Sequence, residues 1–234
     1  GTNTAIGVDC LQANTTASDN TGVGHSALEA NTTGTRNSAV GKNSLGANTT
    51  ANDNTAFGHN TLSANTTGNN NTVVGTSAGS TLTTGVQNTF IGALTGDGTD
   101  DGARNTAIGY LTLSGNCGDD NSAVGENSLF ATTGSKNTGI GGNSGEANTS
   151  GNHNVFLGFE AGVTGSPGGN NTGGSGSVFL GDDNIDAAHI QVDWTVASDA
   201  RDKTDFTALD LGLDFVKALA PVTYKWDKRS KYGD

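Results

Sequence analysis

Residues 37–41 read Asn-Ser-Ala-Val-Gly, and residues 54–58, 17 positions later, read Asn-Thr-Ala-Phe-Gly. This pattern of Asn, usually Thr or Ser, any residue, an apolar residue and Gly recurs at steps of 16 or 17. Its ten copies begin at Asn3, Asn20, Asn37, Asn54, Asn71, Asn88, Asn105, Asn121, Asn137 and Asn154. An eleventh copy without the Asn, residues 177–181, follows a Gly-rich insertion at 165–176. Such a fixed period is typical of a solenoid, in which each coil stacks on its neighbours.

Each position of the repeat carries its own type of residue. Three places after the Asn stands an apolar and mostly β-branched residue, which predicts an inward strand position. The members of this apolar column are Ile6, Val23, Val40, Phe57, Val74, Ile91, Ile108, Val124, Ile140, Leu157 and Leu180. The next place is Gly in all eleven copies, which predicts either a positive φ or a close approach of two backbones. Eight places after the Asn stands Leu or Gly, which indicates a second and narrower apolar row.

The length of the repeat favours β-structure. Two short strands, a Gly turn and an Asn-Thr-Thr-Gly turn fit into 17 residues, whereas a helical coil would have wider apolar spacing and fewer glycines. We therefore predict an all-β fold, a parallel β-solenoid or β-roll of about 17-residue coils. One apolar side chain and one Leu per coil make too thin a core for an isolated cylinder, because ordering each residue costs roughly 1–2 kcal/mol. This predicts a parallel homotrimer with the chains packed around one axis.

The composition excludes several classes of protein. The 234 residues include 37 Gly, 2 Pro and no Met, and only 32% are hydrophobic, which is unlike an ordinary globular domain. No apolar run approaches the roughly 18 residues of a membrane span, so we expect no membrane insertion. The net charge is -12, and residues 1–198 hold 16 acidic and 4 basic residues. Such a surface repels phosphates, which disfavours nucleic acid as a partner. Because the chain opens without Met, inside the repeat pattern, we expect a piece of a longer or processed protein.

Two polar features of the repeat have structural explanations. Asn-Thr-Thr sequences match the acceptor pattern for N-glycosylation at Asn14, Asn31, Asn48 and Asn65. We favour the alternative that stacked Asn and Thr side chains form hydrogen-bonded ladders. The residues directly before the repeat Asn predict a surface charge ladder, because opposite charges follow one another on successive coils. These residues are Asp19, Arg36, Asp53, Asn70, Gln87, Arg104, Asp120, Lys136 and His153.

Three carboxylates fall within five residues at Asp97, Asp100 and Asp101, among glycines. Hard cations such as calcium are often bound by such oxygen ligands. The spacing is not that of a defined calcium loop, so the alternative is a solvated acidic turn. A threefold axis would bring three copies of one carboxylate together and favour the ion. We expect no other cofactor, because the repeats contain no phosphate loop, zinc spacing or Ser-His-Asp arrangement.

The last 36 residues differ from the repeats. Gly falls to two, and the apolar residues from Leu209 to Leu219 predict a short amphipathic helix that ends before Pro221. Residues 222–226 then predict a strand. We therefore divide the chain into a repeat shaft at 1–185, a connecting strand and junction at 186–198, and a short α+β segment at 199–234.

This C-terminal segment resembles a known family. A Ser-Asp-x-Arg-x-Lys box at 198–203 and a Pro-Val-x-Tyr-x-Trp strand at 221–226 flank the helix. Together they are similar to the start of the intramolecular chaperone domain at the C-terminus of bacteriophage tailspikes and tail fibres, including the endosialidases. That domain normally continues well past the Trp strand, so we expect residues 199–234 to be its N-terminal part.

The resemblance implies trimerisation, chaperoned folding and one self-cleavage at Ser198–Asp199. It assigns Ser198 as the nucleophile and Lys203 as the base, and Lys203 can act only when burial lowers its pKa. Which carbonyl is attacked stays open, and the alternative is that Ser198 merely caps a turn.

The repeats resemble coils of phage and giant-virus fibre proteins and, more distantly, the head repeats of trimeric autotransporter adhesins. These likenesses imply a structural tail-fibre segment of the virion that attaches to a glycan or protein receptor on the host. The alternative is a bacterial trimeric surface adhesin or extracellular filament protein. We expect no turnover enzyme, because a glycan-degrading tailspike needs paired carboxylates beside aromatic platforms. Tyr110 is the only Tyr or Trp before Trp194.

Overall fold

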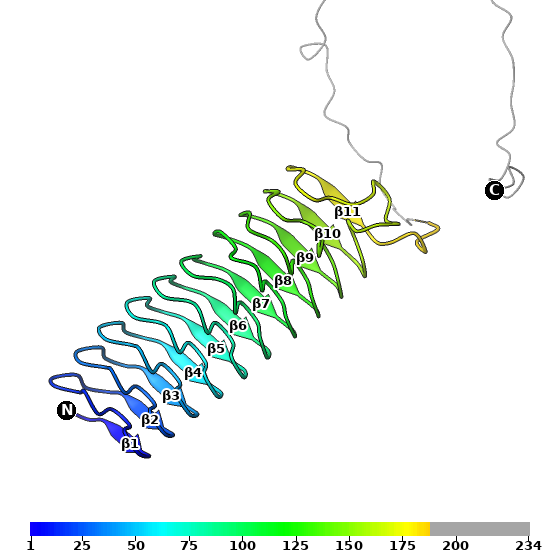
Figure 1. The fold of residues 1–234 in the computed structure, drawn as a ribbon. Coiled ribbons are helices and arrows are strands. Elements are labelled where there is room, and N and C mark those ends of the chain that lie inside the picture. Colours follow the sequence, from blue (N-terminus) through cyan, green and yellow to red (C-terminus); the bar gives the residue numbers. More distant parts are fainter. Residues whose placement is uncertain (188–234) are drawn as a thin grey trace, which may run out of the picture. The chain divides into compact units, whose positions relative to one another are not determined.

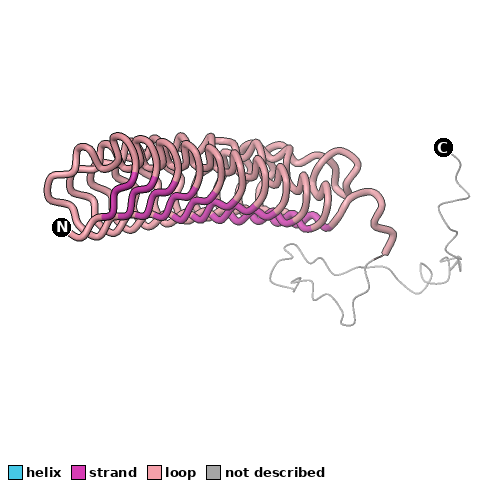
Figure 2. The backbone as a smooth tube through the Cα atoms, turned by 90° about the horizontal axis from the view of Figure 1, so that it is seen from below, coloured by secondary structure: helices cyan, strands magenta, loops and turns pink. Residues whose placement is uncertain are grey.

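A computed structural model describes residues 1–187 of the chain. These residues form a stack of coils, each contributing one short strand to the same side of the stack (Figures 1 and 2). No helix in this part of the chain is long and apolar enough to cross a membrane. The predicted helix at 209–219, the predicted strand at 222–226 and the junction residues Ser198 and Lys203 lie outside the described residues.

The strands pair in parallel, in chain order, as one eleven-stranded sheet. Equivalent repeat positions face each other, as in the pairing of Thr55 with Thr72. The strands are β1 (Thr4–Ile6), β2 (Thr21–Val23), β3 (Ser38–Val40), β4 (Thr55–Phe57), β5 (Thr72–Val74), β6 (Thr89–Ile91), β7 (Thr106–Ile108), β8 (Ser122–Val124), β9 (Thr138–Ile140), β10 (Val155–Leu157) and β11 (Val178–Leu180). The predicted parallel β-solenoid is thus confirmed.

The expectation of two strands in each coil was wrong, because each coil of the described shaft contains a single strand of three residues. The rest of the coil turns repeatedly through left-handed backbone, as the coil after β3 illustrates. There Asn43, Leu45 and Asp53 have φ of 57°, 51° and 59°. Residues in this region of φ interrupt an extended strand, so the remaining wall of the coil is built from turns.

The sequence also assigned the wrong strand position to the core. From β2 to β10 the middle residue of each strand is buried, whereas the apolar column lies one residue later and points outward. Nine of its members are 37–61% exposed. Neighbouring strand residues point to opposite faces, so only one of the two positions can be inside. The β-branched residues of the apolar column suit a strand core, but the interior is narrow. It accepts mostly Ala and Gly at the middle position of the strands.

The predicted Leu row is confirmed, and its gaps are explained by the inner strand residues. Leu28, Leu45, Leu62, Leu113 and Leu129 are fully buried opposite small inner residues such as Ala39 and Ala56. Three coils instead place Phe90, Phe156 or Phe179 at the inner position, and the rings of Phe90 and Phe156 are fully buried. A Cβ at Gly96 would lie 2.5–2.8 Å from the Phe90 ring, and one at Gly145 would lie 2.6 Å from the Phe156 ring. Each Phe therefore fills the volume that Leu fills elsewhere.

The invariant turn glycine meets both of the conditions that the sequence suggested. Gly109 has φ of +140°, and a Cβ on it would lie 2.6 Å from the carbonyl oxygen of Gly125 in the next coil. A side chain would therefore be strained by its own backbone and would also collide with the neighbouring coil.

Buried Asn side chains connect the coils inside the shaft. Asn54 is fully buried, and its Oδ1 accepts the backbone N–H of Asn71 at 2.9 Å. Its Nδ2 donates to the carbonyl of Gly68 at 2.8 Å. A second ladder contains the residues that match glycosylation sites, where Asn48 Nδ2 donates to Asn31 Oδ1 at 2.8 Å. Because Asn31, Asn48 and Asn65 are fully buried, the ladder interpretation is confirmed for them.

Replacement of Asn54 by Ala is expected to destabilise the shaft by about 1–3 kcal/mol, because the buried backbone N–H of Asn71 loses its partner, whereas the Gly68 carbonyl keeps a hydrogen bond from Asn65 Nδ2. Chemical denaturation monitored by circular dichroism measures this change. Asn170→Ala, at an exposed position, is the control and should leave the free energy of unfolding nearly unchanged. Equal stability of the two variants would contradict a structural role for the ladder.

Candidate functional site

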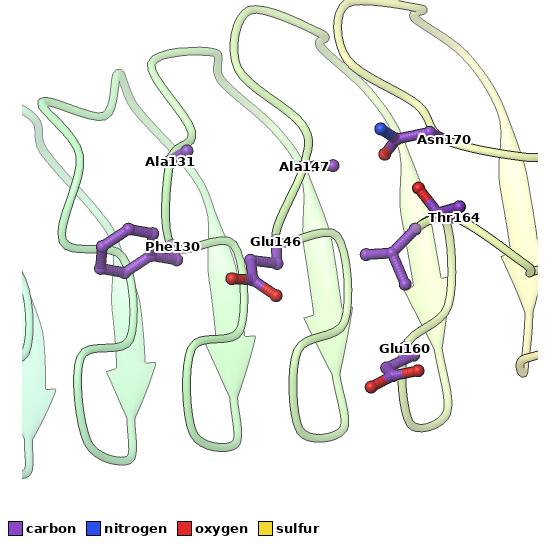
Figure 3. Close-up of a pocket in the computed structure, with 8 residues that line it drawn as sticks. Phe130, Ala131, Glu146, Ala147, Glu160, Thr164 and Asn170 are labelled. Carbon is purple, nitrogen blue, oxygen red and sulfur yellow. The ribbon is translucent and has the colours of Figure 1, made fainter.

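A groove of about 470 Å³ opens beside the loops that follow β8, β9 and β10 (Figure 3). Figure 3 shows Phe130, Glu146 and Glu160 on three successive coils, with Thr164 and Asn170 beside them. The lining residues are Phe130, Ala131, Glu146, Ala147, Glu160, Val163, Thr164 and Asn170. The groove therefore combines an apolar ring, two carboxylates and neutral polar groups.

Departures from the repeat create this groove. Phe130, Glu146 and Val163 stand nine places after their repeat Asn, where four of the seven preceding coils carry only Gly or Ser. The step from β10 to β11, measured from Val155 to Val178, is 23 residues. These additional residues include Asn170 and add one wall of the groove. Loops at such irregularities are frequent places for binding residues on a rigid scaffold.

The lining determines which ligands suit the groove. The Phe130 ring is 37% exposed and offers an apolar surface. The carboxylates of Glu146 and Glu160, the Thr164 hydroxyl and the Asn170 amide provide hydrogen-bonding groups. Among residues 1–187, no Lys, Arg or His lines the groove. This chemistry suits a hydroxyl-rich ligand that is neutral or basic and disfavours an anionic one.

Sequence reasoning missed this site. Tyr and Trp platforms and carboxylates close in sequence are the usual signals of such a site, whereas Glu146 and Glu160 are 14 residues apart and lie on one groove only because the coils stack. Larger residues at a repeat position that is mostly small, next to an insertion, were the available signal.

The structure does not bring the predicted calcium ligands together. In the described residues, no three His, Cys, Asp or Glu side chains form a group that could hold a metal ion. At the acidic turn Asp100 instead accepts a hydrogen bond from the Thr83 hydroxyl. Calcium binding by Asp97, Asp100 and Asp101 stays a prediction for the assembled protein.

The predicted charge ladder forms on the surface. Arg36 donates two hydrogen bonds to Asp53, at 2.6 and 2.7 Å, and thereby holds the pKa of that carboxyl below its ordinary value. Arg104 bonds both Asp119 and Asp120, at 2.8 and 2.7 Å. All these side chains are at least 38% exposed. Exposed pairs contribute little stability, so the ladder mainly favours one register between coils.

Comparison with known protein families identifies the C-terminal segment. Residues 198–234 match the model of a family described as chaperone of endosialidase. The match begins at the box Ser and includes the residues on which the sequence resemblance rests, so that resemblance is confirmed. Neither a curated protein nor a solved structure matches the chain. The parallel solenoid and the matched segment together support a tailspike-like protein with a C-terminal chaperone domain.

Proposed function

We propose that this chain is a structural segment of a bacteriophage tail fibre or tailspike that attaches the virion to its host. The observation that carries the proposal is the combination, in one chain, of a solenoid shaft with a chaperone-of-endosialidase segment. The shaft is built from coils that contact only their neighbours, which suits an elongated, rigid spacer. In this proposal the C-terminal segment helps copies of the chain to fold and to associate as a parallel homotrimer.

The groove beside β8 to β10 is where we place the contact with the host receptor. Its apolar ring and hydrogen-bonding groups match the two kinds of surface on a saccharide, the C–H face and the hydroxyls. Glu146 and Glu160, with the surplus of acidic residues on the shaft, favour a neutral or basic glycan over a sialylated one.

A binding experiment tests this proposal. Fluorescently labelled chain is applied to a panel of bacterial strains and to an array of neutral, basic and acidic glycans. We expect binding to a subset of strains and to neutral or basic glycans, with at least tenfold weaker binding after Phe130→Ala or Glu146→Gln.

The matched control for this experiment is Glu29→Gln, because Glu29 has the same repeat position as Glu146 but lies outside the groove. This control should bind like the original chain. Absence of binding to every strain would contradict host attachment. Preference for sialylated glycans, or equal weakening by the control, would contradict the assignment of the groove.

Self-cleavage by the C-terminal segment is a further part of the proposal, supported by the family match at 198–234. We expect one cut at Ser198–Asp199 after the chains assemble, because Lys203 can act as a base only once assembly has desolvated it. Ser198→Ala and Lys203→Ala should each leave the chain intact while still allowing assembly.

Intact-mass measurement on the assembled protein, with these residues followed by the remainder of a chaperone domain of this family, decides this point. A fragment ending at Ser198 in the original chain, and its absence in both variants, is the expected result. With the whole chaperone domain present, an uncut protein, a cut elsewhere, or full cutting in Lys203→Ala would contradict the assignment.

A further inference from the structure

The exposed apolar column is the unexplained feature of the shaft. It occupies the third position of every strand from β1 to β11, so the parallel sheet arranges it as one continuous row along the stack. Its central members are typical, with Ile91 40% exposed, Ile108 39% and Val124 40%. Nine of its eleven members are at least 37% exposed, so the row forms one continuous apolar patch of the kind that marks an interaction surface.

The rest of the same face is uncharged. We call the first and third residues of β1 to β11 the outer face, and its first residue is Thr or Ser in nine strands and Val in two. None of these residues is Asp, Glu, Lys or Arg, although residues 1–187 hold 15 acidic and 4 basic residues. A sheet face that lies in water ordinarily carries polar and charged side chains. This face instead has the apolar centre of a protein interface.

We infer that the outer face is the surface through which copies of this chain pack against one another, in parallel and in register. A second copy presents the same row of side chains at the same coil spacing, so every coil meets its equivalent. Contact through charged faces would instead bring surfaces of the same sign together. This inference rests on the association of chains in the proposed function and assigns it to a face.

The turn beside the outer face supports the same occupant. The residue after each member of the apolar column is Gly, so no side chain rises at the edge of the row. On the other edge, the charge ladder with Arg36, Asp53 and Arg104 lies two residues before each strand. The face therefore has a bare edge that permits close approach and a charged edge that stays in water, as the polar rim of an interface does.

Oxidative cross-linking of variants with one added cysteine tests the inference on the full chain. In Ile91→Cys, we expect copies packed in register to bring the Cβ atoms of the new cysteines within the ≈ 3.5–4.5 Å that a disulfide requires. We expect most of this variant to become a covalent dimer under mild oxidation. Phe130→Cys is the matched control, because Phe130 is similarly exposed, at 37%, but does not belong to the outer face. It should cross-link no more than the original chain with its own Cys10 and Cys117.

A second measurement is independent of cysteine chemistry. Light scattering should show an oligomer for the original chain and for Phe130→Asp, and a lower mass or at least tenfold weaker association for Ile91→Asp with Ile108→Asp. Circular dichroism identifies a variant that has failed to fold, in which case the cross-linking result decides.

The outcomes separate the inference from the proposed function. An oligomer without cross-linking at Ile91 would overturn the outer face as the interface but leave association through another face. Equal cross-linking of Ile91→Cys and Phe130→Cys would also overturn it. A monomeric original chain, at 23.4 kDa, would overturn both this inference and the homotrimer. If Ile91→Cys cross-links as expected but the original chain binds no bacterial strain, host attachment alone would be contradicted.

Discussion

Gly109→Ala is expected to destabilise the shaft by about 2–6 kcal/mol, the sum of a strained backbone and a steric clash. At φ of +140° an L-residue is strained, and the new Cβ would lie 2.6–2.7 Å from the backbone of Gly125 and from the Thr112 hydroxyl. Neither backbone can withdraw without breaking the hydrogen bonds between coils. We expect a lower melting temperature and a broadened transition, because coils on the two sides of Gly109 lose their coupling.

The control for this prediction is Gly176→Ala. Gly176 also has a positive φ, of +71°, but a Cβ there would meet no atom within 4 Å. It should cost only about 1–2 kcal/mol, the ordinary penalty of a left-handed L-residue. Thermal unfolding of both variants by circular dichroism measures the difference. Equal melting temperatures would show that close packing between coils does not limit the turn.

The second large effect concerns the exchange of volume between Phe90 and the Leu row. Phe90→Ala is expected to cost about 3–5 kcal/mol, because a fully buried ring leaves a cavity. Gly96→Leu alone should also destabilise strongly, since a Cβ there would lie 2.5 Å from the ring. The combination Phe90→Ala with Gly96→Leu recreates the pairing of Ala107 with Leu113. We therefore expect the double variant to be more stable than either single variant.

A double-mutant cycle of unfolding free energies measures this compensation. The backbone permits the exchange, because Gly96 has φ of +62° and Leu113 has φ of 52° at the same repeat position. Additive destabilisation in the double variant would contradict the volume argument. Phe90→Ala with Ser80→Leu, which adds a Leu at a different repeat position, is the control and should show no rescue.

The repeat pattern predicted most of the fold because each of its positions faces one environment in every coil. The parallel stacking, the Leu row and the turn glycine follow from the spacing and residue type alone. The inward face of the strand did not follow, because both middle and third residues are apolar, as in Thr89-Phe90-Ile91. The β-branched residues of the third position favoured that column for the core, but the interior has room for a large residue such as Phe90 only where Leu is absent.

The candidate site was beyond prediction for another reason. Glu146 and Glu160 belong to different coils, and Asn170 belongs to an insertion whose path no repeat specifies. Their proximity depends on how the longer coil between β10 and β11 returns to the stack. The charge ladder, by contrast, was predictable because Arg36 and Asp53 hold the same repeat position in consecutive coils.

The exchange between Phe and Leu also determines how such a gene can lengthen or shorten. Duplication or loss of one Ala and Leu coil, such as the one containing Ala56 and Leu62, preserves the packing of Leu beside a small inner residue and changes the shaft by one strand spacing, about 4.8 Å. A Phe coil is different, because Phe90 also lies 3.3 Å from the Cβ position of Gly79 in the preceding coil. A Phe coil is therefore duplicated or lost without a steric clash only together with the coil before it. The shaft thus changes length by one coil in some regions and by two in others.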